Sequence, residues 1–297
     1  MEHNDERGNE GGILFVCATP IGNLKDITLR GLDVLRSVDF VVAEDTRVAK
    51  RLLNHYGIKK PVISFHEHSK KGRLRHLLNL LESGHKLAII SDAGTPCISD
   101  PGSELVSEAL SRGFRVVPIP GPSAITAALS VAGMKAQRFI FLGFLPRERN
   151  ERKKLLSEVS LWRYPIVIYE APHRLVETLT QLLQVLGNRK VVVARELTKQ
   201  FEEVFASDLE SARKHFLSTE PRGEFTLVIE GASKPSQCEV CKVDEKDIDE
   251  LIQKMLSEGS STKEVVNRLV LEFGMRHKEA YERTLIARNK FASNKMT

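Results

Sequence analysis

Polar residues that could carry chemistry follow the ends of several predicted strands, and one loop combines them with a shaped backbone. The loop Ser91–Gly102 comes after the apolar run Leu87–Ile90 and before an amphipathic segment, so we expect it at the carboxyl end of a strand. Two glycines and two prolines shape it, and such a bend leaves backbone amides free to meet a ligand. Because open α/β sheets bind ligands at this edge, we interpret Ser91–Gly102 as the centre of a cofactor cleft.

Three carboxylic acids near this edge have different interpretations. Asp100 precedes a proline, a pair typical of a helix N-cap followed by proline at the first helical position, and this role explains Asp100. It does not explain Asp92, which ends the strand itself. Asp45 and Arg47 follow another predicted strand. Asp45 could cap the next helix, but the pair also suits substrate positioning, and we favour the latter.

The second half of the chain offers two further polar loops. Tyr169–Arg174 leaves a predicted strand and contains Glu170 and His173, two groups able to accept a proton. A single histidine is more often structural than catalytic, but His173 lies among charged neighbours. Arg222–Thr226 enters the last predicted strand. Polar groups from these two loops could complete a cleft between two domains, where small-molecule sites are common.

The common nucleotide and metal motifs do not account for this cleft. The exit of the first strand, Cys17–Asn23, contains neither Gly-x-Gly-x-x-Gly nor the Gly-Lys-Ser/Thr of a phosphate loop. Cys238 and Cys241 form a lone Cys-x-x-Cys without a second pair or a histidine at metal spacing. We therefore predict reduced thiols and no bound metal, and the sequence disfavours an ordinary dinucleotide or phosphate-loop site.

Alternating strand and helix patterns position these loops. Apolar runs predict strands at Ile13–Thr19, Asp39–Ala43, Pro61–Phe65, Lys86–Asp92, Arg115–Pro120, Phe139–Phe144, Pro165–Glu170, Lys190–Leu197, Glu203–Ala206 and Phe225–Glu230. Helical spacing predicts helices at Thr28–Arg36, Thr46–His55, Lys71–Glu82, Ser103–Ser111, Arg174–Leu186 and Leu209–Phe216. In the first half, near-continuous apolar strands separated by helices indicate a parallel or mixed sheet covered on both faces.

These patterns divide the chain into five parts. We expect a disordered tail (1–12), two α/β domains (13–135 and 136–232), a polar linker (233–243) and a helical C-terminal domain (244–297). In the last part, Ser260–Val266 predicts an N-capped helix, and two short helices around Gly274 resemble a helix-turn-helix. A small helical cap packed on the main body explains the same pattern equally well.

Composition limits the class of protein. Of 297 residues, 41% are hydrophobic and 28% charged, which is typical of a globular protein with room for two domains. No apolar run could span a membrane and the first residues lack a signal-peptide core, so we predict a cytoplasmic protein. The net charge of +5 is compatible with a nucleic-acid partner. Arg147, Arg149 and Lys153 could contact RNA phosphates, although such runs are usually solvated faces.

Five motifs in this order resemble the ribosomal RNA small subunit methyltransferase I family, a branch of the S-adenosylmethionine-dependent tetrapyrrole methylase superfamily. The motifs are Thr19–Leu24, Glu44–Arg47, Ser91–Gly102, Pro120–Ala124 and Glu170–Arg174. The resemblance runs from Leu14 to about Ala232, and the helical tail is similar to that family's C-terminal domain. The chain departs from the pattern at Cys97, where we expect a small residue, often glycine.

The resemblance implies two α/β domains of tetrapyrrole methylase type with S-adenosylmethionine in the cleft between them. The Asp92–Pro96 bend would meet the methionine end of the cofactor, and the Arg222–Thr226 stretch would lie nearer its adenosine. The cofactor-binding residues implied by motif position are Asp92, Ala93, Gly94, Thr95, Pro96, Pro122, Ser123, Ala124, Tyr169, Glu170, Pro172, Gly223, Glu224 and Thr226.

The resemblance also implies 2′-O-methylation of a cytidine ribose in the decoding region of 16S rRNA by a homodimer, with the small ribosomal subunit or a late assembly particle as partner. The expected substrate side comprises Pro20, Gly22, Asn23, Asp45, Arg47, Arg147, Arg149 and Lys153. Attack by a ribose hydroxyl needs a proton acceptor. We place Glu170 and His173 ahead of Asp92 and Asp45, because their loop would close over the cofactor. The alternatives are a methylase of a corrin-type ring and a non-catalytic RNA-binding protein of the same fold.

Overall fold

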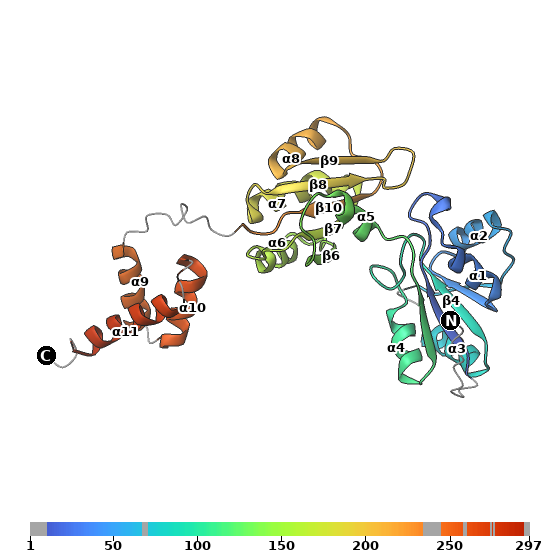
Figure 1. Ribbon diagram of the computed structural model, residues 1–297, viewed down its shortest axis with the longest axis horizontal. Helices are drawn as coiled ribbons and strands as arrows, with labels where there is room; N and C mark the ends of the chain where they lie inside the picture. The colour runs from blue at the N-terminus through green and yellow to red at the C-terminus, as the bar shows by residue number, and fades with distance from the viewer. Residues whose placement is uncertain are drawn as a thin grey trace. The chain divides into compact units, whose positions relative to one another are not determined.

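The computed structural model describes residues 11–66, 71–233, 245–257, 260–273, 275 and 277–293. The chain forms two units, Met1–Ala232 and Ser233–Thr297, and Figure 1 labels most of their helices and part of their strands. The first unit contains two five-stranded sheets with helices packed on them, which confirms the predicted α/β class. In the second unit, every regular element among the described residues is a helix. The predicted linker lies outside the described residues except for Ser233, as does the predicted tail up to residue 10.

The first sheet is entirely parallel, with strand order β3-β2-β4-β1-β5. Its strands are β1 (Ile13–Cys17), β2 (Phe40–Ala43), β3 (Val62–Ser64), β4 (Lys86–Ile90) and β5 (Arg115–Ile119). Strands β1 and β4 are neighbours. The loops that leave these two strands therefore meet at the carboxyl edge of the sheet, the edge where open α/β sheets bind ligands.

Helices cover both faces of this sheet, as its apolar strands predict. The connecting elements are η1 (Leu24–Asp26), α1 (Leu29–Ser37), α2 (Thr46–His55), α3 (Lys71–Glu82) and α4 (Ser103–Ser111). Leu35 and Leu53 from α1 and α2 pack with Val41 in one buried cluster. Leu77 and Leu105 from α3 and α4 pack in another. Because successive residues of a strand point to opposite faces, the two clusters lie on opposite sides of the sheet.

The second sheet is mixed, with strand order β6-β7-β10-β8-β9. Its strands are β6 (Ile140–Phe144), β7 (Ile166–Glu170), β8 (Lys190–Arg195), β9 (Glu203–Asp208) and β10 (Phe225–Ile229). Strands β6 and β7 pair in parallel, and the remaining neighbours pair antiparallel. Each of these five strands overlaps a strand that the sequence predicts.

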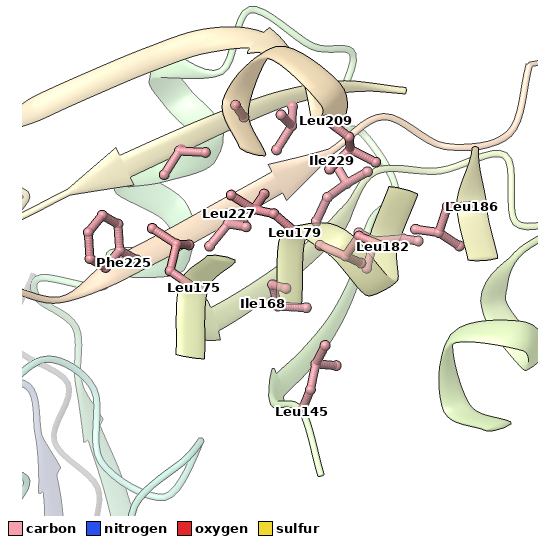
Figure 2. Packing of buried hydrophobic residues seen from close by; sticks show 14 of the residues in the cluster. Leu145, Ile168, Leu175, Leu179, Leu182, Leu186, Leu209, Phe225, Leu227 and Ile229 are labelled. Atoms are coloured by element: carbon pink, nitrogen blue, oxygen red, sulfur yellow. The ribbon is translucent and has the colours of Figure 1, made fainter. Parts of the chain in front are cut away.

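Helices also pack on both faces of the second sheet. They are α5 (Ala124–Val131), α6 (Arg149–Val159), η2 (Pro172–Arg174), α7 (Leu175–Leu186) and α8 (Leu209–Ser218). Figure 2 shows Leu179 and Leu182 of α7 against Leu227 of β10, and each such buried leucine contributes about 1.5–3 kcal/mol. Ile125 of α5 packs with Val228 on the other face. Helix α6 is absent from the predicted helices, because its charged residues indicate only a basic surface.

The second unit has a core of its own. Its helices are α9 (Glu245–Ser257), α10 (Thr262–Phe273) and α11 (His277–Ser293). Ile252, Leu269 and Ala280, one from each helix, are fully buried together. The predicted cap of α10 is confirmed: the Ser261 N–H donates to Glu264 Oε2 at 2.8 Å, and the Glu264 N–H donates back to Ser261 Oγ at 3.3 Å, the reciprocal pattern of a capping box.

Candidate active site

The loop after β4 is fastened to the exit of β1. The Thr19 N–H donates to Gly94 O at 2.8 Å, and the Gly94 N–H donates to Thr19 O at 3.1 Å. The Thr19 hydroxyl also donates to Ser91 O at 3.1 Å. Gly94 has a φ of +82°, which only glycine adopts without strain. Residues from two neighbouring strands therefore fix the bend that the Gly and Pro pattern predicts.

A cavity of about 360 Å³ opens beside this loop, and we call it the loop cavity. Its size falls in the range of small-molecule sites, about 300–1,000 Å³. The central loop forms one wall and residues of the second sheet form the other. The predicted cofactor-binding residues that line it are Asp92, Ala93, Gly94, Thr95, Ser123, Ala124, Tyr169, Glu170, Pro172, Glu224 and Thr226.

Three predicted cofactor-binding residues, Pro96, Pro122 and Gly223, do not line the loop cavity. Pro96 is buried. The carbonyl of Pro122 accepts a hydrogen bond from the Thr95 hydroxyl at 3.2 Å. Gly223 has a φ of +88°, and a Cβ there would lie 2.5 Å from the Glu196 side chain. Of the three, Pro122 contacts a lining residue, Thr95, directly.

Asp100 lines the loop cavity, and its predicted role as a helix cap is wrong. Helix α4 begins at Ser103, its N-cap is Gly102, and no side chain caps it. Burial, followed by the negative charges of Glu44 and Asp92, raises the pKa of Asp100 to about 6. A carboxyl group with a raised pKa in a cleft is a candidate functional group. The sequence misleads here because an Asp-Pro pair can occur both at a helix N-terminus and in a loop that lines a cleft, and the pair alone does not distinguish the two.

The sequence also gives no signal for the apolar lining of the loop cavity. This lining includes Ile21, Ile98, Phe144, Leu197 and Phe225. Phe144 lies against Tyr169, with ring centroids 5.6 Å apart, and burial raises the pKa of Tyr169 to about 12. Single apolar residues at strand ends and in loops carry no chemical signature in a sequence, so only the structure assigns them to the site.

At Cys97, where the resemblance leads us to expect a small residue, the backbone conformation is one that suits glycine. Its φ is +67°, in the left-handed region that favours glycine. Burial raises the pKa of the Cys97 thiol to about 11, so the thiol is neutral near pH 7. Cys97 does not line the loop cavity, and its departure from the pattern leaves the cavity wall intact.

A second cavity of about 350 Å³ lies beside α2, and we call it the α2 cavity. Its lining comprises Thr19, Pro20, Ile21, Gly22, Leu24, Val48, Arg51, Leu52, Asp92, Ala93, Lys199 and Glu224. Two of the predicted substrate residues, Pro20 and Gly22, are in this lining. Asn23 caps η1 and donates its backbone N–H to Thr198 Oγ1 at 3.0 Å.

Asp92 belongs to the lining of both cavities. Its carboxylate accepts a long hydrogen bond of 3.4 Å from the Asp45 N–H. Burial is the largest influence on Asp92 and raises its pKa above the usual value, while the Arg51 charge opposes the rise. Asp92 is therefore a carboxylate with a raised pKa at the place where a ligand of one cavity would meet a ligand of the other.

Asp45 and Arg47 are engaged with each other. Asp45 is the N-cap of α2 and accepts from the Arg47 N–H at 2.8 Å, and the Arg47 guanidinium reaches its carboxylate at 2.7 Å. These hydrogen bonds lower the pKa of Asp45 to about 2. Neither residue lines either cavity. The capping role considered for Asp45 is confirmed.

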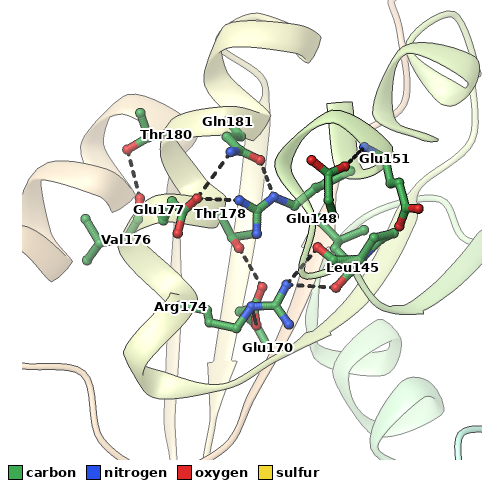
Figure 3. Close-up of polar contacts among 12 residues, drawn as sticks. Leu145, Glu148, Glu151, Glu170, Arg174, Val176, Glu177, Thr178, Thr180 and Gln181 are labelled. Atoms are coloured by element: carbon green, nitrogen blue, oxygen red, sulfur yellow. Dashed lines mark hydrogen bonds and ion pairs between the residues drawn. The ribbon is translucent and has the colours of Figure 1, made fainter. Parts of the chain in front are cut away.

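Glu170 is buried and fully hydrogen-bonded. Its exposed fraction is 1%. One carboxylate oxygen accepts from the Ala171 N–H at 2.9 Å and lies 3.4 Å from Arg174 Nε, and the other accepts from the Thr178 hydroxyl (Figure 3). His173 lies exposed on η2 and lines neither cavity. The structure therefore places the two predicted proton acceptors in very different surroundings.

The predicted RNA-contacting residues lie on and before α6. Arg147, Arg149 and Lys153 are exposed, and none lines either cavity. Their neighbour Arg152 is 2% exposed and instead pairs with Gln181 and Glu177 of α7. The basic run thus has one residue, Arg152, in the protein interior, whereas Arg147, Arg149 and Lys153 lie on a solvated face.

A strained turn after β8 joins the two halves of the first unit. Glu196 and Thr198 have φ values of +49° and +68°, which side-chain-bearing residues seldom adopt. Lys199 Nζ donates to Glu196 Oε1 at 2.9 Å and to Glu224 Oε2 at 3.0 Å. A Cβ on Gly22 would lie 2.3 Å from Lys199 Cγ. Backbone strain of this kind clusters at functional sites, and here it lies beside both cavities.

Metal binding and membrane insertion find no support in the described part of the chain. Among the described residues, no group of three or more His, Cys, Asp or Glu side chains is placed to hold a metal ion. Cys238 and Cys241 lie outside those residues. Within the same part of the chain, no helix has the length and apolar character needed to cross a bilayer.

Comparison with known proteins gives consistent matches. The family model described as Tetrapyrrole (Corrin/Porphyrin) Methylases matches residues 14–213. Ribosomal RNA small subunit methyltransferase I of Thermotoga maritima is 48% identical over 220 residues, which cover 74% of this chain and 99% of that protein. The protein of the same name in Bacillus subtilis is 39% identical over 278 residues, covering 91% and 93% of the two chains.

Solved structures match the fold at low sequence identity. The methyltransferase CobJ matches with a TM-score of 0.57 and 17% identity, covering 75% of this chain and 95% of that one. A diphthine synthase matches with a TM-score of 0.57 and 16% identity, covering 74% and 90%. At such identities the likeness is one of fold, and it agrees with the two-sheet architecture described above.

Proposed function

The chain belongs to the ribosomal RNA small subunit methyltransferase I family of the tetrapyrrole methylases, and from this premise we propose that it methylates RNA of the small ribosomal subunit with S-adenosylmethionine as methyl donor. We further propose that the acceptor is the ribose 2′-oxygen of a cytidine in the decoding region of 16S rRNA. The observation that carries the proposal is the pair of cavities that meet at Asp92. A transferase needs one site for the donor and an adjoining site for the acceptor.

The loop cavity has the chemistry that S-adenosylmethionine requires. Ile98, Phe144 and Leu197 supply an apolar surface for a flat ring. Asp92 and Asp100 supply carboxylates for a ligand that carries an ammonium and a sulfonium charge. The hydroxyl of Ser123 makes no capping bond to α5 and could meet a polar edge of the ligand. Mixed apolar and polar lining of this kind suits an adenosine joined to an amino acid.

Orientation is the main contribution that this chain would make to the reaction. When bound, S-adenosylmethionine supplies an electrophilic methyl group with a good leaving group. The bridge between Thr19 and Gly94 fixes the loop, and fixed loops hold reacting groups at bonding distance. The apolar side chains of the loop cavity exclude water from the donor.

Asp92 is the group that we propose as proton acceptor for the ribose hydroxyl. It lines both cavities, and its raised pKa makes it a stronger base than an ordinary aspartate. Glu170 and His173, which the sequence places first, remain predictions that no observation tests directly. Both oxygens of Glu170 are already engaged, which favours a positioning role for that residue.

The two alternatives are weaker. A corrin-type substrate rests on solved neighbours that share the fold alone, whereas relatives sharing far more of the sequence are named for ribosomal RNA. A non-catalytic RNA-binding protein would not need a fixed loop and a cavity with paired carboxylates. Calorimetry with S-adenosylmethionine separates this second alternative from both enzymes, because only the enzymes bind the cofactor.

Methyl transfer from labelled S-adenosylmethionine to small ribosomal subunits tests the proposal. We expect label in 16S rRNA, mapped to the 2′-oxygen of one cytidine in the decoding region. Label on a base would overturn the 2′-O assignment, and transfer only to a corrin-type ring would overturn the RNA substrate. Comparing naked 16S rRNA with assembled subunits tests the proposed preference for a particle, and the mass of the protein in solution tests the proposed homodimer.

A further inference from the structure

The α2 cavity has a volume and a set of lining residues of its own, so it is more than an extension of the cofactor site. Its volume is about 350 Å³, close to the 360 Å³ of the loop cavity. Seven of its lining residues do not line the loop cavity, and they come from the exit of β1, from η1 and from α2. They are Thr19, Pro20, Gly22, Leu24, Val48, Arg51 and Leu52. The chain therefore has a separate recess for a second, similarly sized ligand.

The two cavities share a wall. Ile21, Asp92, Ala93, Lys199 and Glu224 line both. A group transferred from a ligand in one cavity to a ligand in the other would cross this wall. Among the shared residues, Asp92 is the carboxylate whose burial raises its pKa, so the proton acceptor proposed above lies at the crossing point.

The α2 cavity combines an apolar surface with one prominent cation. Pro20, Leu24, Val48 and Leu52 supply surface on which a base or sugar could pack. Arg51 adds a guanidinium on the side of α2. A planar guanidinium suits the bidentate recognition of a phosphate. This combination matches a nucleotide, which carries a flat apolar base, a ribose and a phosphate.

Arg47 and Lys199, two other cations near the site, have carboxylate partners. Arg47, one helical turn before Arg51, is held by Asp45 at 2.7 Å. Lys199 is held by Glu196 and Glu224 at 2.9 and 3.0 Å. Arg51, by contrast, acts on Asp92 through its charge at longer range. It is thus the cation of the α2 cavity best placed to receive a phosphate.

We propose that the α2 cavity receives the nucleotide to be methylated, displaced from its neighbours in the RNA, with Arg51 bound to a phosphate beside it. This inference rests on the proposed function, since it names the place of the acceptor in that reaction. It assigns Arg51 a binding role that positions the ribose toward the wall shared with the loop cavity. Enzymes that modify a nucleotide within structured nucleic acid commonly draw it out of the stack into such a recess.

Replacement of Arg51 tests the inference. We expect Arg51→Ala to raise the KM for small ribosomal subunits about tenfold, the loss expected for one charge-assisted contact, and to reduce the slope of log affinity against log salt by about 1. Arg51→Lys should recover part of the lost affinity for small subunits, because lysine keeps the positive charge but lacks the paired donors of the guanidinium. Lys50→Ala is the matched control, since Lys50 is an exposed cation on the same helix outside both cavities.

Affinity for S-adenosylmethionine, measured by calorimetry, separates this role from a structural one. Arg51→Ala should bind the cofactor as the unaltered chain does, with an unchanged melting temperature. Val48→Phe, which fills the recess, should reduce RNA methylation about tenfold or more and also leave cofactor affinity unchanged. If Arg51→Ala has the same KM and salt slope as Lys50→Ala, the inference is overturned. The proposed function still stands in that case, provided that the unaltered chain transfers the methyl group. No transfer by the unaltered chain would overturn both.

Discussion

The two walls of the loop cavity differ in what their carboxyl groups are free to do. The wall from the first sheet carries Asp92 and Asp100, which are partly exposed and have pKa values raised by burial. The wall from the second sheet carries Glu170, whose exposed fraction is 1% and whose two oxygens are both hydrogen-bonded. The difference teaches that a carboxylate beside a cleft is not thereby reactive, because its hydrogen-bond partners decide whether it can exchange a proton.

Strand geometry explains the difference. Side chains alternate between the faces of a strand, so Glu170 shares a face with Ile166 and Ile168, which belong to the helix-covered core. Tyr169 shares the opposite face with Val167, which packs with α5. Asp92 has no such constraint, because it lies in the loop beyond β4. The first wall therefore offers reactive groups, and the second holds the geometry of the cleft.

The largest expected effect is on the first wall. Asp92→Asn should reduce the rate of methyl transfer at saturating cofactor about 100-fold or more, the usual contribution of a general base, with a smaller loss of cofactor affinity because Asp100 still lines the loop cavity. Single-turnover methylation of small subunits measures it. Asp33→Asn is the control, since Asp33 is an exposed carboxylate of α1 that lines neither cavity. An unchanged rate for Asp92→Asn would move the acceptor to another group.

On the second wall, Glu170→Gln should act on stability first. Disrupting a buried carboxylate that is bonded to Thr178 and paired with Arg174 should cost about 2–3 kcal/mol of unfolding free energy. Urea unfolding measures the loss, with the exposed residue Glu158 of α6 as control through Glu158→Gln. A variant with unchanged stability and abolished methyl transfer would instead support the proton-acceptor role predicted from the sequence.

The smallest expected effect concerns Asp100 and depends on pH. Its pKa is raised from 3.8 to about 6 in the folded protein, so the folded state favours the neutral carboxyl. The cost to stability is therefore absent below about pH 4 and complete above about pH 6. Asp100→Asn should stabilise the cofactor-free protein by about 1 kcal/mol at pH 8, where solvent screening limits the gain, and should have little effect at pH 4.

Thermal or urea unfolding at the two pH values checks this prediction. The exposed carboxylate Asp33 again provides the control through Asp33→Asn. The same difference at pH 4 and pH 8 would show that Asp100 acts through packing and not through its charge. In that case Asp100 would no longer count as a group with a raised pKa, and Asp92 alone would distinguish the first wall from the second.

Much of the fold follows from the sequence. The predicted helices Thr46–His55, Lys71–Glu82 and Ser103–Ser111 coincide with α2, α3 and α4. Each of the ten predicted strands overlaps an observed one within about two residues at its ends. These elements are predictable because local periodicity records which side chains face the core. Helix α6 was missed because its buried Arg152 is a charged residue, which a hydrophobic pattern does not count.

The site was predictable in its location and less so in its chemistry. Motif positions gave fourteen expected cofactor-binding residues, and eleven of them line the loop cavity in the structure. They give no signal for Arg51 or Lys199, which belong to no recognisable motif. They also misassign Asp100, because a local pattern cannot distinguish a helix cap from a residue that turns into a cleft.

By itself, the sequence determined the strands, the helices and the loop at whose edge the ligand site lies, since these depend on residues near one another in the chain. Only the tertiary structure decided which charged groups act there. The contact between Asn23 and Thr198 joins residues 175 positions apart, and Asp92 meets Arg51 and Lys199 only after three distant segments converge. Burial and hydrogen bonding arise from that convergence, and they decide whether a carboxylate can accept a proton or only holds the structure of the cleft.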